Sequence, residues 1–164
     1  MSDPELVADG LDHQLDPRVI PLQRIGGSIF AGLISIGSFV ALALADDGLT
    51  WIRFAVWLAL VVLLFWHFYR WPARAYAHTS YRVDDQGIEI RKGVHFRVVI
   101  NVPRSRVQHI DVSQGPLERK YGLGTLVIYT AGTDHAKVEL GGLEHGRALG
   151  IREHLLPSGA GDAV

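Results

Sequence analysis

The stretch "IGGSIFAGLISIGSFVALALA", residues 25–45, decides the fold because it contains no charged side chain. A helix rises about 1.5 Å per residue, so a segment of this length covers the roughly 30 Å hydrocarbon core of a bilayer. The sequence therefore predicts a first membrane-spanning helix over residues 25–45. The alternative is a buried helix of a soluble protein, and it needs a partner core that the rest of the 164-residue chain is too short to supply.

A second apolar run, "LTWIRFAVWLALVVLLFWHFY", covers residues 49–69 and carries Arg53 and His67 near its ends. Charged side chains at these positions can reach the headgroup layer, so they do not prevent insertion. We expect a second span over residues 49–71, which Pro72 ends. The short connection contains Asp46 and Asp47, so the two spans form an antiparallel hairpin.

The flanking charges predict the orientation of this hairpin. Arginines lie before the first span and after the second, whereas the connection is acidic, and Lys and Arg near spans favour the cytoplasmic side. Both termini should therefore be cytoplasmic, with residues 1–24 as an acidic segment that carries five acids against two arginines. The sequence "ALA" at 43–45 resembles a signal-peptidase site, but the leader is acidic and the apolar core is too long for a signal peptide.

Small residues recur every four positions along the first span, in the stripe Gly27, Ala31 and Ser35. Such a stripe lets two helix backbones approach closely. It predicts packing against the second span or against another chain, and the spacing does not distinguish the two.

From Thr79 onward apolar residues recur at every second position, which is the spacing of half-buried strands. Six or so antiparallel strands are expected, followed by a helix with the stripe Ala148, Ile151, Arg152 and Leu155, beside which lie Leu149 and Leu156. The apolar strand positions are Tyr81 and Val83, Ile88 and Ile90, Phe96, Val98, Ile100 and Val102, Ile110 and Val112, Leu126 and Ile128, and Val138 and Leu140.

Strands of this length must curl or close to bury one face, so residues 73–157 predict a small β-barrel or orthogonal sandwich covered by the carboxy-terminal helix. The segment 115–124 is expected to be one helical turn or a loop. Residues 158–164 are too small and polar to fold and predict a disordered tail.

The run "RVQHIDVSQGPLERKYGLGTL", residues 106–126, together with the two spans, resembles the membrane-flanked bacterial pleckstrin-homology-like family, the bacterial PH domain 2 or DUF304 type. The resemblance covers about residues 20–156. It implies an α+β protein of the bacterial plasma (inner) membrane, in which a transmembrane hairpin precedes a split β-barrel capped by a helix. Phosphoinositide-binding relatives of this fold carry lysines and arginines in the first strand-to-strand loop. Here that loop contains Asp84 and Asp85, so this type of recognition is not expected.

The residues offer little for catalysis or metal binding. His109 and Asp111 share one face of a strand and could orient a general base, but no suitable nucleophile is evident and an exposed polar face is the expected role. The chain has no cysteine, and its eight histidines lack metal-ligand spacing. We therefore expect no catalytic residue, no metal and no cofactor, and the net charge of −1 does not favour nucleic acid as a partner.

Arg104, Arg106, Arg119 and Lys120 flank one strand and could converge at one end of the sheet. Such a basic rim could bind anionic lipid headgroups, each cation contributing about 1 kcal/mol near the surface. It could equally form ordinary solvated ion pairs with Asp111, Glu118 and Glu89.

Three functions remain. The sequence favours an interaction or scaffold module, held at the membrane to dock another protein, to organise a membrane complex or to self-associate. The alternative is a sensor of anionic lipid or a small ligand that uses the basic rim. The third, an integral-membrane enzyme, lacks any constellation of nucleophile, base and metal.

Overall fold

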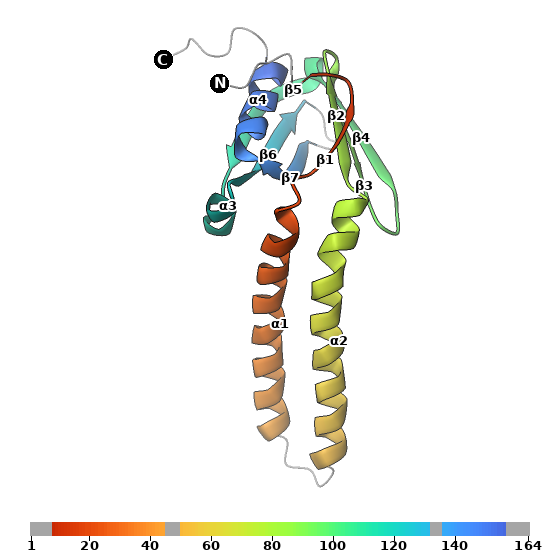
Figure 1. The fold of residues 1–164 in the computed structure, drawn as a ribbon, viewed down its shortest axis with the longest axis vertical. Coiled ribbons are helices and arrows are strands. Elements are labelled where there is room, and N and C mark those ends of the chain that lie inside the picture. The colour runs from red at the N-terminus through yellow and green to blue at the C-terminus, as the bar shows by residue number, and fades with distance from the viewer. Residues whose placement is uncertain (1–7, 45–49, 132–135, 157–164) are drawn as a thin grey trace. The chain divides into compact units, whose positions relative to one another are not determined.

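A computed structural model describes residues 8–44, 50–131 and 136–156 (Figure 1). The contacts divide the chain into two units. A helical unit contains residues 20–74, and a sheet unit contains residues 1–19 together with 75–164.

The helical unit is built from α1 (Val19–Leu44) and α2 (Thr50–Ala77), with 26 and 28 residues. At 1.5 Å per residue they measure about 39 and 42 Å, and both are long and apolar enough to cross a membrane. Our expectation that Pro72 ends the second helix was wrong, because α2 continues to Ala77. Proline removes one backbone donor, but the following turn still closes, and the Thr79 hydroxyl donates to the Ala75 carbonyl over 2.8 Å.

Helix α1 contacts α2 at the first glycine of the small-residue stripe. A Cβ atom added to Gly27 would lie 2.7 Å from Cδ1 of Phe68, and Ala31 is fully buried. Further along, the Trp57 indole donates to the Ser38 hydroxyl over 2.9 Å. The predicted packing of the first span against the second is therefore present at Gly27.

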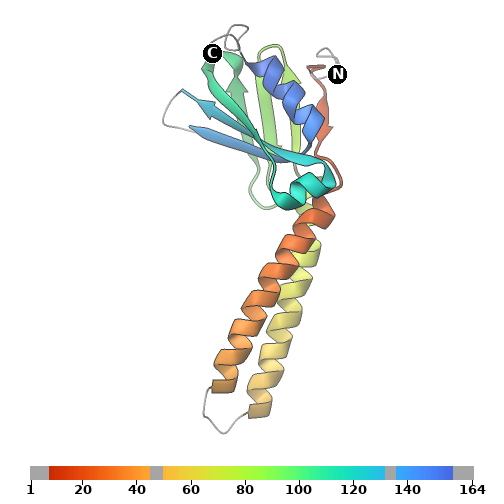
Figure 2. The same cartoon turned by 90° about the vertical axis from the view of Figure 1, so that its left-hand side faces the viewer.

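The sheet unit contains two antiparallel sheets (Figures 1 and 2). The first has the strand order β1-β2-β3-β4 and the second the order β5-β6-β7. The strands are β1 (Asp12–Gln14), β2 (Ser80–Asp84), β3 (Gly87–Lys92), β4 (Val98–Pro103), β5 (Val107–Ser113), β6 (Leu123–Thr130) and β7 (Lys137–Glu144).

Three helical elements complete the sheet unit: η2 (Arg104–Arg106) between the sheets, α3 (Pro116–Tyr121) between β5 and β6, and α4 (His145–Leu155) after β7. Helix α4 packs on all three strands of the second sheet. Of its predicted stripe, Ala148, Ile151 and Leu155 are fully buried, whereas Arg152 is half-buried. This arrangement confirms the α+β class with a terminal helix. Within segment 115–124, Pro116–Tyr121 form the short helix α3, and the last two residues already belong to β6.

The core lies where the alternation placed it, with two exceptions. Ile88, Ile90, Ile100 and Val102 are buried, but Phe96 is 86% exposed and Val98, the first residue of β4, is 43% exposed. Gly93 has φ 124°, and the turn that it opens carries residues 94–97 out of the ladder. The expectation that Phe96 and Val98 share the buried face was therefore wrong.

The amino-terminal segment contributes a strand that the sequence did not predict. Residues of β1 pair with β2, and the Gly10 amide donates to the Val83 carbonyl over 3.0 Å. The Asp16 amide donates to the Gly142 carbonyl of β7 over 2.8 Å. Since Val19 is also buried, residues 8–19 are an integral part of the sheet unit.

Candidate functional site

The four predicted rim residues do not form one surface. Arg104 and Arg106 lie in η2, immediately before β5, whereas Arg119 and Lys120 lie in α3, after β5. A seven-residue strand is about 20 Å long. The two pairs therefore occupy opposite ends of β5.

Arg104 has a structural role. Its backbone amide donates to the Gln86 carbonyl over 2.7 Å, and its guanidinium donates to the Leu156 carbonyl over 3.0 Å. Carbonyls at the end of a helix lack intrahelical donors, so this bond caps α4. Arg106 is exposed and makes no ion pair with any residue that the structure describes.

Arg119 and Lys120 are exposed on α3. The alternative pairing with Glu118 is not found among the described residues, and Glu118 instead accepts hydrogen bonds from the Gly115 amide at 2.7 Å and the Thr125 hydroxyl at 2.8 Å. Its carboxylate thus fixes the start of α3 and joins it to β6.

His109 and Asp111 share a face of β5, with 2.7 Å between the imidazole Nε2 and the carboxylate. Their side chains are 66% and 52% exposed, so the pair lies in solvent and not in a cavity. Among the described residues, no group of three or more His, Asp and Glu side chains could hold a metal ion.

An open groove follows the free edge of the first sheet. Within the described residues, strand β4 pairs with β3 on one side only. On its other side lies a hollow of about 210 Å³, which we call the edge groove. It is lined by Val99, Ile100, Asn101, Val102, Pro103, Arg106, Thr130 and Ala131.

The phase of the ladder determines which backbone groups face this groove. The Arg104 amide donates to the Gln86 carbonyl, and bonded and non-bonded pairs alternate along an antiparallel ladder. Arg104 and Gln86 are a bonded pair, so the even-numbered residues of β4 point their N–H and C=O groups toward β3. The odd-numbered Val99 and Asn101 therefore point theirs away from β3. These groups are available to another extended chain.

A second, larger hollow of about 440 Å³ lies between the end of α2 and the β3–β4 hairpin, and we call it the basal hollow. Basic residues line it and no acidic residue does. Its lining residues are Gln14, Ala77, His78, Thr79, Ser80, Arg91, Lys92, Gly93, Arg97, Val98 and Val99.

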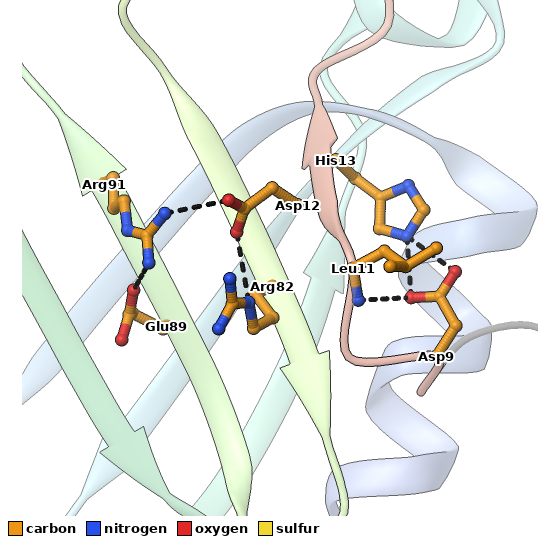
Figure 3. A network of polar contacts seen from close by, with 7 residues as sticks. All are labelled: Asp9, Leu11, Asp12, His13, Arg82, Glu89 and Arg91. Carbon is orange, nitrogen blue, oxygen red and sulfur yellow. Dashed lines mark hydrogen bonds and ion pairs between the residues drawn. The ribbon is translucent and has the colours of Figure 1, made fainter.

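The cations of the basal hollow differ in how they are held. Arg91 is fixed by Asp12, 2.9 Å away, and by Glu89 (Figure 3). Lys92 and Arg97 are exposed, and neither makes an ion pair within the described part of the chain. The sequence analysis did not predict Lys92 and Arg97 as a pair, because it placed Arg97 in a strand and not in the turn that follows Lys92.

The polar network in Figure 3 attaches β1 to its neighbours. Asp12 binds Arg82 at 3.1 Å and Arg91 at 2.9 Å, and Asp9 binds His13 at 2.9 Å. The hydrogen bond from His13 lowers the pKa of Asp9 below its ordinary value of 3.8. Desolvation raises the pKa of Asp12, but hydrogen bonds and attraction from Arg82 and Arg91 outweigh it and lower that pKa as well.

Two sheets closed by a terminal helix, in a chain with two helices of membrane-spanning length, define a membrane protein with a pleckstrin-homology-like β module. The bacterial PH domain family matches residues 22–158. The chain belongs to this family, which confirms the resemblance of residues 106–126.

A relative in Bacillus subtilis (strain 168), the UPF0699 transmembrane protein YdbS, is 46% identical over 56 residues. The matched segment covers 34% of this chain and 35% of that protein, so the match spans about a third of the relative's length. No solved structure matches the chain.

Proposed function

We propose that this protein is a membrane-anchored docking module. In this proposal the hairpin of α1 and α2 holds the sheet unit at the cytoplasmic face of the bacterial plasma membrane. The edge groove then binds an extended, acidic segment of a partner protein, which adds a strand to β4. The role is binding and not catalysis.

The unpaired edge of β4 is the observation that carries the proposal. Extended peptides add to exposed sheet edges through main-chain hydrogen bonds, and side-chain pockets beside the edge provide specificity. The outward backbone groups of Val99 and Asn101 supply the first requirement, and the edge groove beside them supplies the second.

Charge selects the kind of segment that fits. Arg106 lines the groove, and no Asp or Glu does. An arginine without an ion pair favours a carboxylate, which it can bind through two parallel hydrogen bonds. An acidic segment therefore complements the groove.

The cytoplasmic orientation rests on the arginines that flank the hairpin. Arg24 donates to the Tyr69 carbonyl over 3.1 Å and lies 4.0 Å from the centroid of that ring, and Arg70 lies 4.8 Å from the Trp66 ring. Arginine and aromatic side chains together are typical of a membrane interface, and arginines favour its cytoplasmic side.

The alternative role, a lipid sensor that uses the basic rim, has less support. It requires Arg104, Arg106, Arg119 and Lys120 to act together. Strand β5 separates the two pairs, and Arg104 is engaged with α4.

Photocrosslinking in intact cells tests the docking role. A photoreactive amino acid at Val99 of the full chain should capture one protein, and the captured peptide should be an acidic segment. Asn101→Pro removes an outward N–H group and should abolish capture, whereas Asn101→Ala keeps that group and should retain it. The same reagent at Gln108, which is exposed on β5, is the control.

Three outcomes would contradict the proposal. One is equal capture from Val99 and Gln108. Another is capture that survives Asn101→Pro while the protein remains folded. The third is a crosslink between two copies of this chain, which would identify the edge groove as a self-association surface.

A further inference from the structure

We propose that the tip of the β3–β4 hairpin, residues 92–97, is a contact with anionic phospholipid. In this contact the Phe96 ring enters the headgroup layer, and Lys92 and Arg97 bind lipid phosphates at the mouth of the basal hollow. The inference rests on the membrane location of α1 and α2 but not on the docking of a partner.

The exposure of Phe96 is the first observation. Its side chain is 86% exposed, and the neighbouring Val98 and Val99 are 43% and 59% exposed. Isolated apolar residues on a surface are ordinary, whereas a group of them indicates a site of interaction. Aromatic rings are enriched at the headgroup level of membranes.

The turn that presents Phe96 is built into the backbone. Gly93 has φ 124°, and a Cβ atom at this position would collide with the Phe96 carbonyl. Only glycine fits so close to another backbone. The tip is therefore a defined turn that displays its aromatic ring outside the ladder.

Charge is the second observation. Lys92 and Arg97 flank the tip, and both line the basal hollow together with Arg91 and His78. No acidic residue lines this hollow. Cations near an anionic leaflet contribute about 1 kcal/mol each, so the tip combines an apolar ring with the charges that anionic headgroups attract.

The position of the tip in the sheet unit is the third observation. Strand β2 starts at Ser80, just after α2, and Ser80 pairs with Arg91 near the end of β3. The β3–β4 hairpin therefore turns at the end of the sheet where the chain arrives from α2 (Figure 1). Beyond the pair of Ser80 and Arg91, the β3–β4 hairpin continues for two to three more residues, or about 7–10 Å, before it turns.

The chain between the apolar run and the sheet is short. Only eleven positions separate Tyr69, at the end of the apolar run, from Ser80, at the start of β2. The polar layer of one leaflet is roughly 5–8 Å thick. This short connection keeps the sheet unit near the headgroup layer, and the tip lies at the end of the sheet that the connection enters.

These features distinguish the tip from the β2–β3 turn at the other end of the same strands. That turn carries Asp84 and Asp85, and Asp84 accepts hydrogen bonds from the Gln86 and Gly87 amides, both at 2.9 Å. Its carboxylate organises the turn and repels phosphate. The lipid contact therefore lies at the opposite end of the sheet from this loop.

A single label tests the contact, because the chain contains no cysteine. The full chain carrying His95→Cys is labelled with an environment-sensitive fluorophore and reconstituted in vesicles of phosphatidylcholine and phosphatidylglycerol at about 3:1. We expect acrylamide to quench this label at least threefold less than a label at Gln86→Cys, on the far turn. Headgroup spin-labelled lipid should quench only the first label.

Charge and ring variants separate the two parts of the contact. In the His95→Cys background, Lys92→Glu/Arg97→Glu and Phe96→Ser should each restore acrylamide quenching to within about 1.5-fold of the Gln86 label. Arg119→Glu/Lys120→Glu makes the same change of charge on α3, where both side chains are exposed, and should leave the tip protected.

Equal acrylamide quenching at the two labels would overturn the inference. Equal protection in phosphatidylcholine alone, or protection that survives Lys92→Glu/Arg97→Glu, would also overturn it. The reconstituted vesicles contain no partner protein, so failure here would leave the docking proposal standing.

Discussion

The first sheet has two edge strands, β1 and β4, which differ in length and in how their side chains are held. Strand β1 has three residues and its Asp12 is bound to both Arg82 and Arg91. Strand β4 has six residues, with Val98 and Val99 exposed. Proteins usually protect sheet edges with short strands, charges or bulges, because an open edge pairs with other chains.

In this sheet, a short strand with ion-paired carboxylates covers the β2 edge, and no comparable feature covers the outer edge of β4 in the described residues. At β1 the acidic leader supplies a short strand and the carboxylates that hold it. At β4 the unpaired groups of Val99 and Asn101 remain beside the edge groove. An edge left open in a sheet that protects its other side supports a binding role for β4.

The largest effect is expected from the core side of β4. Ile100 is 9% exposed and Val99 is 59% exposed. Ile100→Ala should lower the free energy of unfolding by about 2–4 kcal/mol, because it leaves a cavity, whereas Val99→Ala should change it by less than about 0.5 kcal/mol. Pulse proteolysis of the full chain in detergent measures both, and equal losses would show that β4 has no free face.

Gly142→Ala tests the second attachment of the amino-terminal segment. Gly142 has φ 80°, and a Cβ atom there would lie 2.7 Å from Cγ2 of Val19. The variant should destabilise the sheet unit by about 1–3 kcal/mol. Gly146→Ala in α4 meets no atom within 4 Å and should be neutral or stabilising by up to about 1 kcal/mol. Similar losses for both variants in the same proteolysis assay would contradict this reading.

Acid should release β1 and leave β4 in place. The pKa of Asp16 is lowered by its hydrogen bond to Arg18, and those of Asp9 and Asp12 are lowered as described above. A carboxyl group with a lowered pKa stabilises the fold above its ordinary pKa of 3.8, and this contribution is lost as the pH falls through the lowered value. A spin label at Leu11→Cys should therefore become mobile only below about pH 3.8, whereas a label at Val99→Cys should not change. Release of the Leu11 label already at pH 5 would contradict the assignment.

The smallest effect is expected from one carboxylate of β1. Asp12→Asn weakens two exposed ion pairs and should raise amide hydrogen exchange severalfold at residues 11–15, with no change in β4. Asp111→Asn, in the exposed pair with His109, is the matched control and should leave exchange in β1 unchanged. Unaltered exchange in the Asp12 variant would mean that main-chain pairing alone holds this edge.

The sequence predicted the parts of the fold whose signals repeat. Two long uncharged runs, the alternation of apolar residues and the stripe of α4 each involve many positions, so single exceptions do not obscure them. Strand β1 has only three residues, which is too few for an alternation to be recognised. Its acids were therefore read only as charge, although Asp12 forms cross-strand ion pairs.

The candidate site was predicted less well, for a geometric reason. Arg106 and Arg119 are close in sequence, but a strand between two connections places those connections at opposite ends of a sheet. The strand predicted around Ile110 and Val112 lies between these two arginines, so their separation could have been inferred from the sequence. The prediction for Phe96 was wrong for a different reason: the positive φ of Gly93 starts a turn where the apolar pattern indicated a strand.

The bond from Arg104 to the Leu156 carbonyl has a practical consequence for anyone who wishes to attach a reporter. It secures the last turn of α4 beside the start of η2, one full length of β4 away from Lys92 and Arg97. A fluorescent protein joined after residue 156 therefore departs roughly 20 Å from the hairpin tip. Such a fusion suits live imaging, since its bulk leaves the tip unobstructed.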